Sequence, residues 1–278
     1  MHIARWLRLL TVTALLLASI GLTMSAPAQS ATSASARSAT VSPAVHAAPR
    51  LAVSMPGPLR SPHTVGPVPS GVRNVLYTEN WGGYVDTGTT FNTVTATWTQ
   101  PRGACDSRQT MDAAFWVGLD GYTSDTVEQT GTLLQCEGVL AIYYAWYEVY
   151  PGAMVTYSST VEPGDSLTAT VAYSDGAYTM TLKDSTQGWT DTTTATGTYA
   201  RSSAEVIVEA PSNLVAILPL ASFGSVTFTG ASVDGEPLNY SGFTSNQLDI
   251  ESSGGTLEES TSSLNSAGDS FTGTWDAS

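Results

Sequence analysis

The segment Val94-Thr95-Ala96-Thr97-Trp98-Thr99 alternates apolar and hydroxyl side chains with a period of two. This alternation is typical of a β-strand with one face in a core and the other toward solvent. It returns at Ser225-Val226-Thr227-Phe228-Thr229 and at Ser270-Phe271-Thr272-Gly273-Thr274-Trp275. The chain is therefore expected to build its core from strands.

A hairpin is predicted in the middle of the chain. Two strand-like runs, 168–173 and 178–182, flank Ser174-Asp175-Gly176-Ala177, and Asp-Gly is a strong hairpin signal. No window after Tyr77 combines capping residues with the 3.6-residue period of a helix. Short strands separated by Gly, Pro, Asp and Ser predict an all-β domain of two packed antiparallel sheets.

The N-terminus resembles an export signal. Arg5 and Arg8 precede an apolar run from Leu9 to Leu22, and Ser25-Ala26-Pro27-Ala28 offers a small-residue cleavage site. The alternative, a membrane anchor, is less favoured because the run is shorter than the roughly 20 apolar residues that span a bilayer. Residues 1–28 are thus predicted to be a signal peptide, and the protein is expected to be secreted, without membrane association.

The next segment, residues 29–77, is rich in Ala, Ser, Pro and Val and is predicted to be mobile. Residues 1–77 carry six arginines and no acidic residue, a formal charge of +6. Residues 78–278 carry 4 basic residues and all 24 acidic ones, a charge of −20. A basic propeptide held by an acidic domain and released by acid is one interpretation, and a simple tether with incidental arginines is the other.

The acidic region, residues 78–278, has the length of a single sandwich domain. Its charge repels nucleic acids and anionic membranes, so neither is expected as a partner. Its two cysteines, Cys105 and Cys136, are expected to form one disulfide in an exported protein. The carboxylates repel one another less as they become protonated, so the domain should tolerate mild acid.

Elimination narrows the chemistry that this domain can perform. The three histidines, His2, His46 and His63, all precede it. The domain therefore cannot use a Ser-His-Asp or Cys-His relay or a His-ligated zinc ion, and no metal or other cofactor is expected. Lys183 is its single lysine, so a Ser-Lys dyad would depend on that residue alone. Carboxyl groups remain as the main acid–base groups, and they work best near their own acidic pKa.

Six motifs follow one another in this domain. They are Asn80-Trp81-Gly82-Gly83-Tyr84-Val85, Ala114-Phe115-Trp116-Val117-Gly118-Leu119-Asp120-Gly121, Glu128-Gln129-Thr130-Gly131, Tyr144-Ala145-Trp146-Tyr147-Glu148-Val149-Tyr150-Pro151, Ala204-Glu205-Val206-Ile207-Val208-Glu209 and Phe223-Gly224-Ser225-Val226-Thr227-Phe228. In order and spacing they resemble the glutamic peptidase family, the eqolisins or pepstatin-insensitive acid proteases. The resemblance covers nearly all of residues 79–260.

The resemblance implies a lectin-like sandwich of two bent sheets, with a catalytic Gln and Glu on neighbouring strands of a concave face. The family's Gln-Thr-Gly motif falls on Gln129. The glutamate that closes the family's Ala-Glu-Trp-Ile-Val-Glu strand falls on Glu209, rather than on Glu205, which has the same strand parity. Polypeptide substrates, the chain's own propeptide as a partner and a monomeric state are expected.

Four further residues are expected to serve the site. Trp116 matches the family motif that lines the groove and is expected to contact substrate, and Trp81 is expected to bind substrate or to support the site. Asp120 is expected to support the site from behind, and Glu148 lies in the matching aromatic strand.

The predicted pair is chemically sufficient for peptide hydrolysis. A carboxylate can take a proton from the attacking water and later give one to the leaving amine. A side-chain amide can hold that water and stabilise the oxyanion of the tetrahedral intermediate.

The sequence departs from the family pattern at two positions. Val206 stands where the family usually has tryptophan. Glu128 stands where the family is usually apolar, and it should point away from Gln129 because adjacent strand residues face opposite sides.

Two other functions fit a β-sandwich with exposed aromatic and acidic residues. One is a non-catalytic lectin-like module that stacks aromatic rings on sugars. The other is a glycoside hydrolase that uses two carboxylates such as Glu148 and Glu209. A propeptide of opposite charge favours a zymogen over a binding module.

Overall fold

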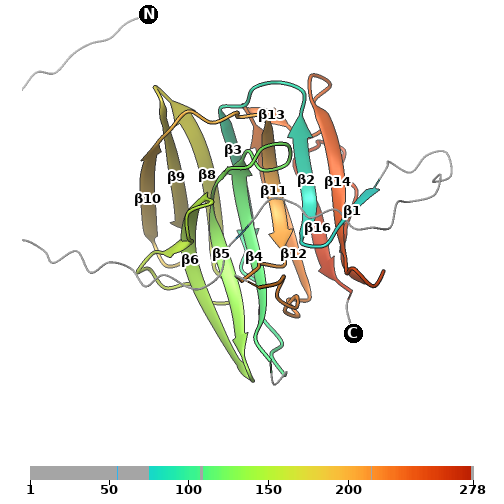
Figure 1. Ribbon diagram of the computed structural model, residues 1–278. Helices are drawn as coiled ribbons and strands as arrows, with labels where there is room; N and C mark the ends of the chain where they lie inside the picture. The colour runs from blue at the N-terminus through green and yellow to red at the C-terminus, as the bar shows by residue number, and fades with distance from the viewer. Residues whose placement is uncertain (1–54, 56–74, 107–108, 214, 277–278) are drawn as a thin grey trace, which may run out of the picture. The chain divides into compact units, whose positions relative to one another are not determined.

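The computed structural model describes residue 55 and residues 75–106, 109–213 and 215–276 (Figure 1). The predicted signal peptide and all of the predicted propeptide except Met55 and residues 75–77 lie outside the described residues. Within the described ranges every regular element is a β-strand, so the prediction of an all-β domain is confirmed. None of these residues belongs to a helix long and apolar enough to cross a membrane.

The described residues form sixteen strands. They are β1 (Val75–Thr78), β2 (Trp81–Thr87), β3 (Thr93–Thr99), β4 (Met111–Leu119), β5 (Val127–Glu137), β6 (Leu140–Tyr150), β7 (Val155–Thr156), β8 (Ser166–Ser174), β9 (Ala177–Asp184), β10 (Trp189–Thr196), β11 (Ser203–Glu209), β12 (Ser225–Val233), β13 (Glu236–Pro237), β14 (Thr244–Glu251), β15 (Leu257–Thr261) and β16 (Phe271–Trp275).

The strands form two layers that belong to one continuous hydrogen-bonded path. One layer has the order β10-β9-β8-β3-β12-β16-β15, and the path continues through β14-β2-β11-β4-β5-β6-β7 in the other. β4 and β5 of the second layer pack across β8 and β9 of the first (Figure 1). All neighbours in this path are antiparallel, whereas β1 pairs with β14 in parallel. The domain is therefore a two-layer β-sandwich.

The alternation that predicted strands also defines the core between the layers. In β3, Val94, Ala96 and Trp98 are buried while the threonines between them are less buried. Trp98 meets Phe228 of β12, with ring centroids 5.6 Å apart. Burying each such side chain contributes about 1.5–3 kcal/mol, so this core is the main source of stability.

The second layer is also buried on its other face. β5 is buried at every position except its last, Glu137. The apolar side chains of this face form a second cluster, which contains Trp81, Trp116 and Trp146. This face therefore offers dry surroundings for any polar group placed on it.

Cys105 and Cys136 form a disulfide with a Cα–Cα distance of 5.4 Å, as the sequence predicted. The bond ties the segment before β4 to the end of β5, strands that pair with each other. Reduction is expected to lower the free energy of unfolding by about 3 kcal/mol, because it releases a loop of 31 residues. Thermal denaturation with and without reductant measures the effect. Two free thiols per chain in denatured, unreduced protein would contradict the pairing.

β1 crosses the boundary that the sequence placed between residues 77 and 78. Val75 and Leu76 pair with Gln247 and Leu248 of β14, so ordered structure begins before that boundary. Residues 75–77 therefore belong structurally to the sandwich.

Candidate active site

Gln129 and Glu209 lie on the same face of the second layer, on strands that share one neighbour. Gln129 is on β5 and Glu209 ends β11, and β4 lies between these two strands. The expectation of directly neighbouring strands is therefore wrong by one strand. β4 brings a small residue, Gly118, opposite Gln129. A Cβ added at Gly118 would lie 2.8 Å from the Trp116 ring and 3.2 Å from the Gln129 Cβ, so the site needs glycine there.

Gln129 is fully buried and its amide is held by two acceptors. Its Nε2 donates to Glu148 Oε2 at 3.0 Å and to the main-chain oxygen of Met55 at 2.8 Å. Glu148 stands directly opposite Gln129 in the β5–β6 register. Because both partners are acceptors, the NH2 group must face them, which fixes the orientation of the amide. Its Oε1 accepts no hydrogen bond from the described residues.

Glu209 is also fully buried and is held by donors. The Trp116 indole N–H donates to its Oε2 at 2.9 Å, and Asn80 Nδ2 donates to its Oε1 at 3.4 Å. These bonds fix the carboxyl group on the face that carries Gln129. Trp116 of β4 and Asn80 therefore belong to the same site, because both donate to Glu209.

The surroundings of Glu209 shift its acidity. Burial raises the pKa of Glu209 well above its ordinary value, and the nearby Glu148 carboxylate raises it further. Hydrogen bonds from Trp116, Trp81 and Asn80 lower this pKa in part. The net direction of the shift therefore favours the neutral, proton-donating form of Glu209.

The two tryptophans among the predicted site residues pack against each other. Trp81 and Trp116 meet edge to face, with centroids 4.9 Å apart, and both are fully buried. Trp116 serves Glu209 directly through its indole N–H. Both tryptophans therefore position Glu209 and form part of the apolar floor of the site.

Among the described residues, Asp120 makes no hydrogen bond to Gln129 or Glu209, and it contacts the backbone nearby instead. Its carboxylate accepts from the N–H groups of Arg201, at 2.6 Å, and Ser202, at 2.8 Å. It also accepts from the Ser124 hydroxyl at 3.1 Å. Asp120 has a φ of 71°, a conformation that Asp tolerates better than most residues. It thereby ties the end of β4 to the segment that leads into β11.

Glu205 occupies a different place from Glu209, although both are on β11. Glu205 and Gln129 stand on either side of Gly118 in the register of β11, β4 and β5, whereas Glu209 is level with Ala114. Burial raises the pKa of Glu205 well above its ordinary value. Glu209 differs from Glu205 in its hydrogen-bond donors, which include Trp116 and Asn80, and in its proximity to Glu148.

Glu128 points away from Gln129 into the core between the layers, as predicted. Both of its carboxyl oxygens are buried, and neither makes a hydrogen bond with the described residues. Burial raises the pKa of Glu128 to about 9, with a smaller contribution from Asp120. Val206, the other departure from the family pattern, is a buried member of the same core.

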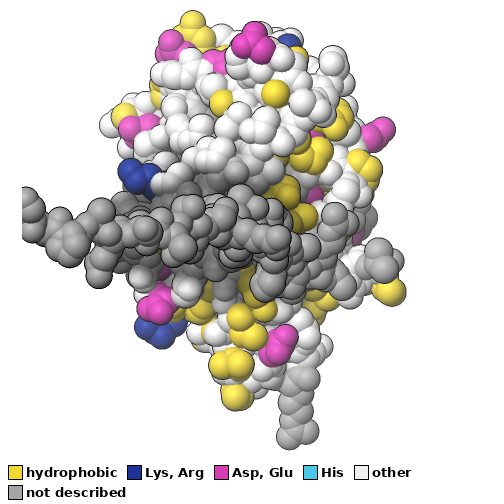
Figure 2. Space-filling model, turned by 90° about the vertical axis from the view of Figure 1, so that its left-hand side faces the viewer, with side chains coloured by type: hydrophobic (Ala, Val, Ile, Leu, Met, Phe, Trp, Pro, Cys, Tyr) yellow, Lys and Arg dark blue, Asp and Glu magenta, His cyan; other side chains and the backbone are white. Residues whose placement is uncertain are grey.

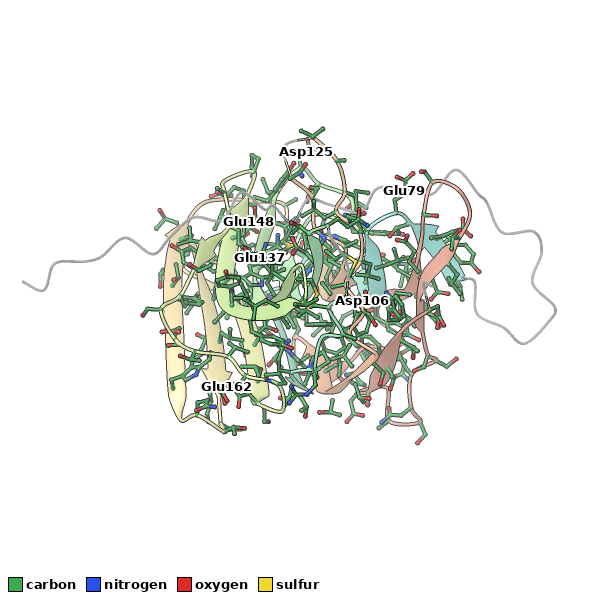
Figure 3. The ribbon with its side chains drawn as sticks, turned by 90° about the horizontal axis from the view of Figure 1, so that it is seen from below. Glu79, Asp106, Asp125, Glu137, Glu148 and Glu162 are labelled. Carbon is green, nitrogen blue, oxygen red and sulfur yellow. A yellow bond between two sulfur atoms is a disulfide. The ribbon has the colours of Figure 1, made fainter. Side chains whose placement is uncertain are left out.

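The acidic residues occupy two kinds of surroundings. Figure 3 shows Glu148 inside the outline of the domain, whereas Asp125 and Glu162 lie near its edge. On the face shown in Figure 2, acidic side chains are scattered over the surface and basic ones are few. The buried carboxyl groups therefore stand apart from the solvated acidic surface.

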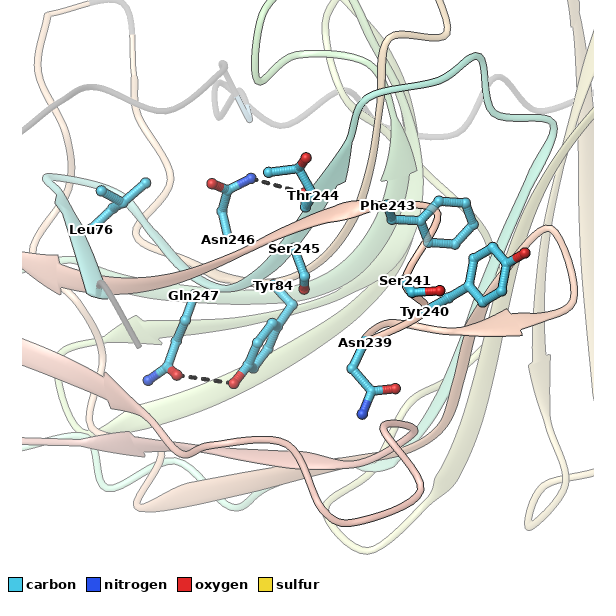
Figure 4. Close-up of a pocket in the computed structure, with 10 residues that line it drawn as sticks. All are labelled: Leu76, Tyr84, Asn239, Tyr240, Ser241, Phe243, Thr244, Ser245, Asn246 and Gln247. Atoms are coloured by element: carbon cyan, nitrogen blue, oxygen red, sulfur yellow. Dashed lines mark hydrogen bonds between the residues drawn. The ribbon is translucent and has the colours of Figure 1, made fainter. Parts of the chain in front are cut away.

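A separate pocket of about 460 Å³ lies beside β14, and none of the predicted site residues lines it (Figure 4). Tyr240, Phe243 and Asn246 line it, and the Tyr84 hydroxyl donates to Gln247 Oε1 at 3.0 Å. Its lining shares no residue with the contacts of Gln129 and Glu209 described above. The candidate site therefore remains on the face of β11, β4, β5 and β6.

Sequence reasoning missed two contributors to the site. Asn80 was visible only as the first residue of a motif, with no role assigned to it. Met55 lies in the segment predicted to be a mobile propeptide, and no local pattern marks it. Its position depends on contacts with residues 74 and 93 positions away.

A β-sandwich that buries a glutamate and a glutamine on one face, in a domain whose sequence lacks histidine, has the features expected of a glutamic peptidase. The chain belongs to the Peptidase A4 family, whose model matches residues 79–272. It is therefore a glutamic-type endopeptidase, a hydrolase that needs polypeptide substrates.

Two curated relatives and two solved structures support this assignment. The chain is 32% identical over 231 residues to aspergillopepsin-2 of Aspergillus niger, covering 74% of this chain and 80% of the relative. It is 35% identical over 176 residues to scytalidopepsin B of Scytalidium lignicola, covering 58% and 66%. A structure of scytalido-glutamic peptidase with a transition state analog inhibitor matches with a TM-score of 0.60 and 28% identity, covering 71% of this chain and 98% of that one. Aspergilloglutamic peptidase from Aspergillus niger matches with a TM-score of 0.53 and 32% identity, covering 60% and 99%.

Proposed function

We propose that the chain is a secreted acid endopeptidase in which Glu209 is the general acid and base and Gln129 stabilises the oxyanion. The observation that carries this proposal is the pair of buried groups on one face, with Glu209 held by Trp116 and Asn80 and Gln129 held by Glu148. Export rests on the N-terminal signal pattern. Neither a sugar-binding module nor a glycoside hydrolase is proposed, because the family is one of peptidases.

The reaction begins with a proton transfer to Glu209. The ionised carboxylate takes a proton from the water that attacks the scissile carbonyl, and the resulting acid gives a proton to the leaving nitrogen. Ionisation requires that the elevated pKa of Glu209 fall when substrate and water replace the dry surroundings seen in the structure. The donors Trp116 and Asn80 favour the ionised form and so assist that change.

Gln129 supplies the charge stabilisation. Its NH2 group already donates to a main-chain carbonyl oxygen, which is the type of atom that becomes the oxyanion. Its Oε1 is an acceptor that can hold the attacking water. Glu148 positions the amide, because its carboxylate accepts from Nε2 and prevents the amide from turning over.

Hydrolysis of a denatured protein near pH 3–4 tests the function. The purified chain, incubated in acid, is expected to release peptides from the substrate. Gel electrophoresis and mass spectrometry of the digest measure this. A chain that binds the protein substrate but releases no new termini across pH 3–7 would contradict the proposal.

A further inference from the structure

Met55 is the one described residue between positions 1 and 74, and it is buried against the proposed catalytic amide. Its N–H donates to Glu148 Oε2 at 3.0 Å, and its carbonyl oxygen accepts from Gln129 Nε2 at 2.8 Å. Its side chain is fully buried in the apolar cluster of this face. Both main-chain polar groups and the side chain are thus accommodated, as they would be in a bound ligand.

The carbonyl of Met55 occupies the place where a substrate carbonyl is needed. The mechanism requires the Gln129 NH2 group to donate to the oxygen of the carbonyl under attack. In the structure that donor is engaged by the Met55 oxygen. Met55 therefore stands in the position of the substrate residue that contributes the scissile carbonyl, and it excludes a substrate from the site.

The surroundings of the Met55 side chain indicate which kind of side chain the corresponding subsite accepts. The cluster that contains it includes Trp116, Trp146, Leu133 and Ile207, all buried. A charged side chain would lose its hydration there beside the carboxyl groups of the site, at a large cost. A flexible, unbranched apolar side chain such as methionine fills an irregular apolar space well.

The residue that follows Met55 in the sequence is Pro56. A proline nitrogen carries no N–H, and its ring fixes φ near −65°. A peptide bond that precedes proline therefore has a ring-substituted nitrogen as its leaving group in place of an ordinary amide nitrogen. A Met–Pro bond is therefore suited to occupying the site without being cut rapidly.

We propose that Met55 is an internal pseudo-substrate, which fills the subsite for the residue preceding the scissile bond and shows that this subsite selects an unbranched apolar side chain. The proposal rests on the assignment of Gln129 and Glu209 as the catalytic pair. It differs from a purely electrostatic attachment of the basic leader, because it depends on one apolar side chain and two main-chain hydrogen bonds.

The first test uses a synthetic peptide of residues 50–60 and the full chain after incubation in acid. The peptide is expected to inhibit cleavage of a fluorogenic substrate competitively. The same peptide with Met55→Asp should inhibit about ten- to a hundredfold less, which corresponds to the loss of one buried apolar side chain. A peptide with Met55→Leu is the matched control and should retain most of the inhibition. Equal inhibition by the Met and Asp peptides would overturn the proposal.

The second test uses the intact precursor. Met55→Asp precursor is expected to cleave the fluorogenic substrate without the lag shown by wild type when both are acidified. Pro56→Ala precursor should be hydrolysed between residues 55 and 56, with water supplying the hydroxyl to the Met55 carbonyl and a proton to the released nitrogen. Pro56→Ala combined with Glu209→Gln should not be cut there, and mass spectrometry identifies the fragment that ends at Met55.

These outcomes separate the two proposals. If the acid-incubated wild type cleaves no substrate, the proposed function fails. If wild type is active but Met55→Asp shows the wild-type lag, and the Pro56→Ala bond stays intact, the catalytic assignment stands and the pseudo-substrate is rejected.

Discussion

Replacing Glu209 with Gln is expected to abolish proteolysis while leaving the fold intact. The amide preserves the size of the side chain and can still accept from the Trp116 indole, but it cannot exchange a proton with water or with the leaving amine. Loss of general acid–base catalysis costs about 100- to 10,000-fold, and here one group performs both transfers. Initial rates on a fluorogenic peptide at pH 4, with circular dichroism as a check on folding, measure the effect.

Gln129→Ala should reduce the rate by about 100- to 1000-fold, the usual cost of removing one oxyanion donor. Glu205→Gln is the matched control on the same strand. Burial raises the pKa of Glu205 and so favours its neutral form, and a neutral amide of the same size should replace it with little disturbance. Its rate should stay within about tenfold of wild type, equivalent to 1.4 kcal/mol. An inactive Glu205→Gln beside an active Glu209→Gln would reverse the assignment.

The strands could be predicted because they follow from short-range patterns in the sequence. In β3 the buried positions Val94, Ala96 and Trp98 are the apolar members of the alternation, and the same rule placed Glu128 and Gln129 on opposite faces. The Asp-Gly signal marked the turn between β8 and β9, where Asp175 and Gly176 both have positive φ. Short-range patterns of this kind carry enough information to define elements and their faces.

The strand order could not be derived from such patterns. β4 lies between β11 and β5 although more than 80 residues separate β4 from β11 in the chain. Which strand inserts between two others depends on long-range pairing, and alternation is the same for any neighbour. The residues of the pair could therefore be named from their motifs, while their separation by β4 had to come from the structure.

Asp120 shows that the partners of a side chain are also hard to predict from sequence. Its place in a motif beside Trp116 suggested a supporting role, but its partners are the N–H groups of Arg201 and Ser202, which no motif identifies. Met55 is the extreme case, because an Ala-, Ser- and Pro-rich segment gives no local reason for burial. The burial of Met55 depends instead on residues far away in the sequence, Gln129 and Glu148.

The domain is expected to lose stability as pH rises from about 4 toward neutrality. Burial raises the pKa of Glu128 to about 9, of Asp86 to about 7, and of Asp112 and Asp249 to about 6. A carboxyl group with a raised folded-state pKa binds its proton more tightly in the folded than in the unfolded chain. The stability is therefore fully present below the unfolded pKa near 4, and it falls until the pH passes the folded pKa of each group.

Glu128 provides the sharpest test of this dependence. Between its unfolded pKa near 4.5 and pH 7 it should cost about 3 kcal/mol of the free energy of unfolding, at 1.4 kcal/mol per pH unit. Glu128→Gln removes the titration and keeps the side-chain volume. The variant should therefore unfold at a higher urea concentration than its parent at pH 7 and at nearly the same concentration at pH 4. Both proteins also carry Glu209→Gln, which prevents self-digestion during the measurement. The parent is therefore the Glu209→Gln protein.

Glu162→Gln is the control, since Glu162 is exposed and its substitution removes the same formal charge. If general repulsion among the acidic residues caused the loss of stability, both substitutions would stabilise the domain at pH 7 to a similar extent. Burial of Glu128 between the layers, near Asp120 and Tyr178, instead predicts a much larger effect for Glu128→Gln. Urea midpoints that are highest at pH 7 for the parent, or equal gains for the two variants, would contradict this origin. A core that holds uncharged carboxyl groups is most stable under the same acidic conditions that are proposed for catalysis by Glu209 and Gln129.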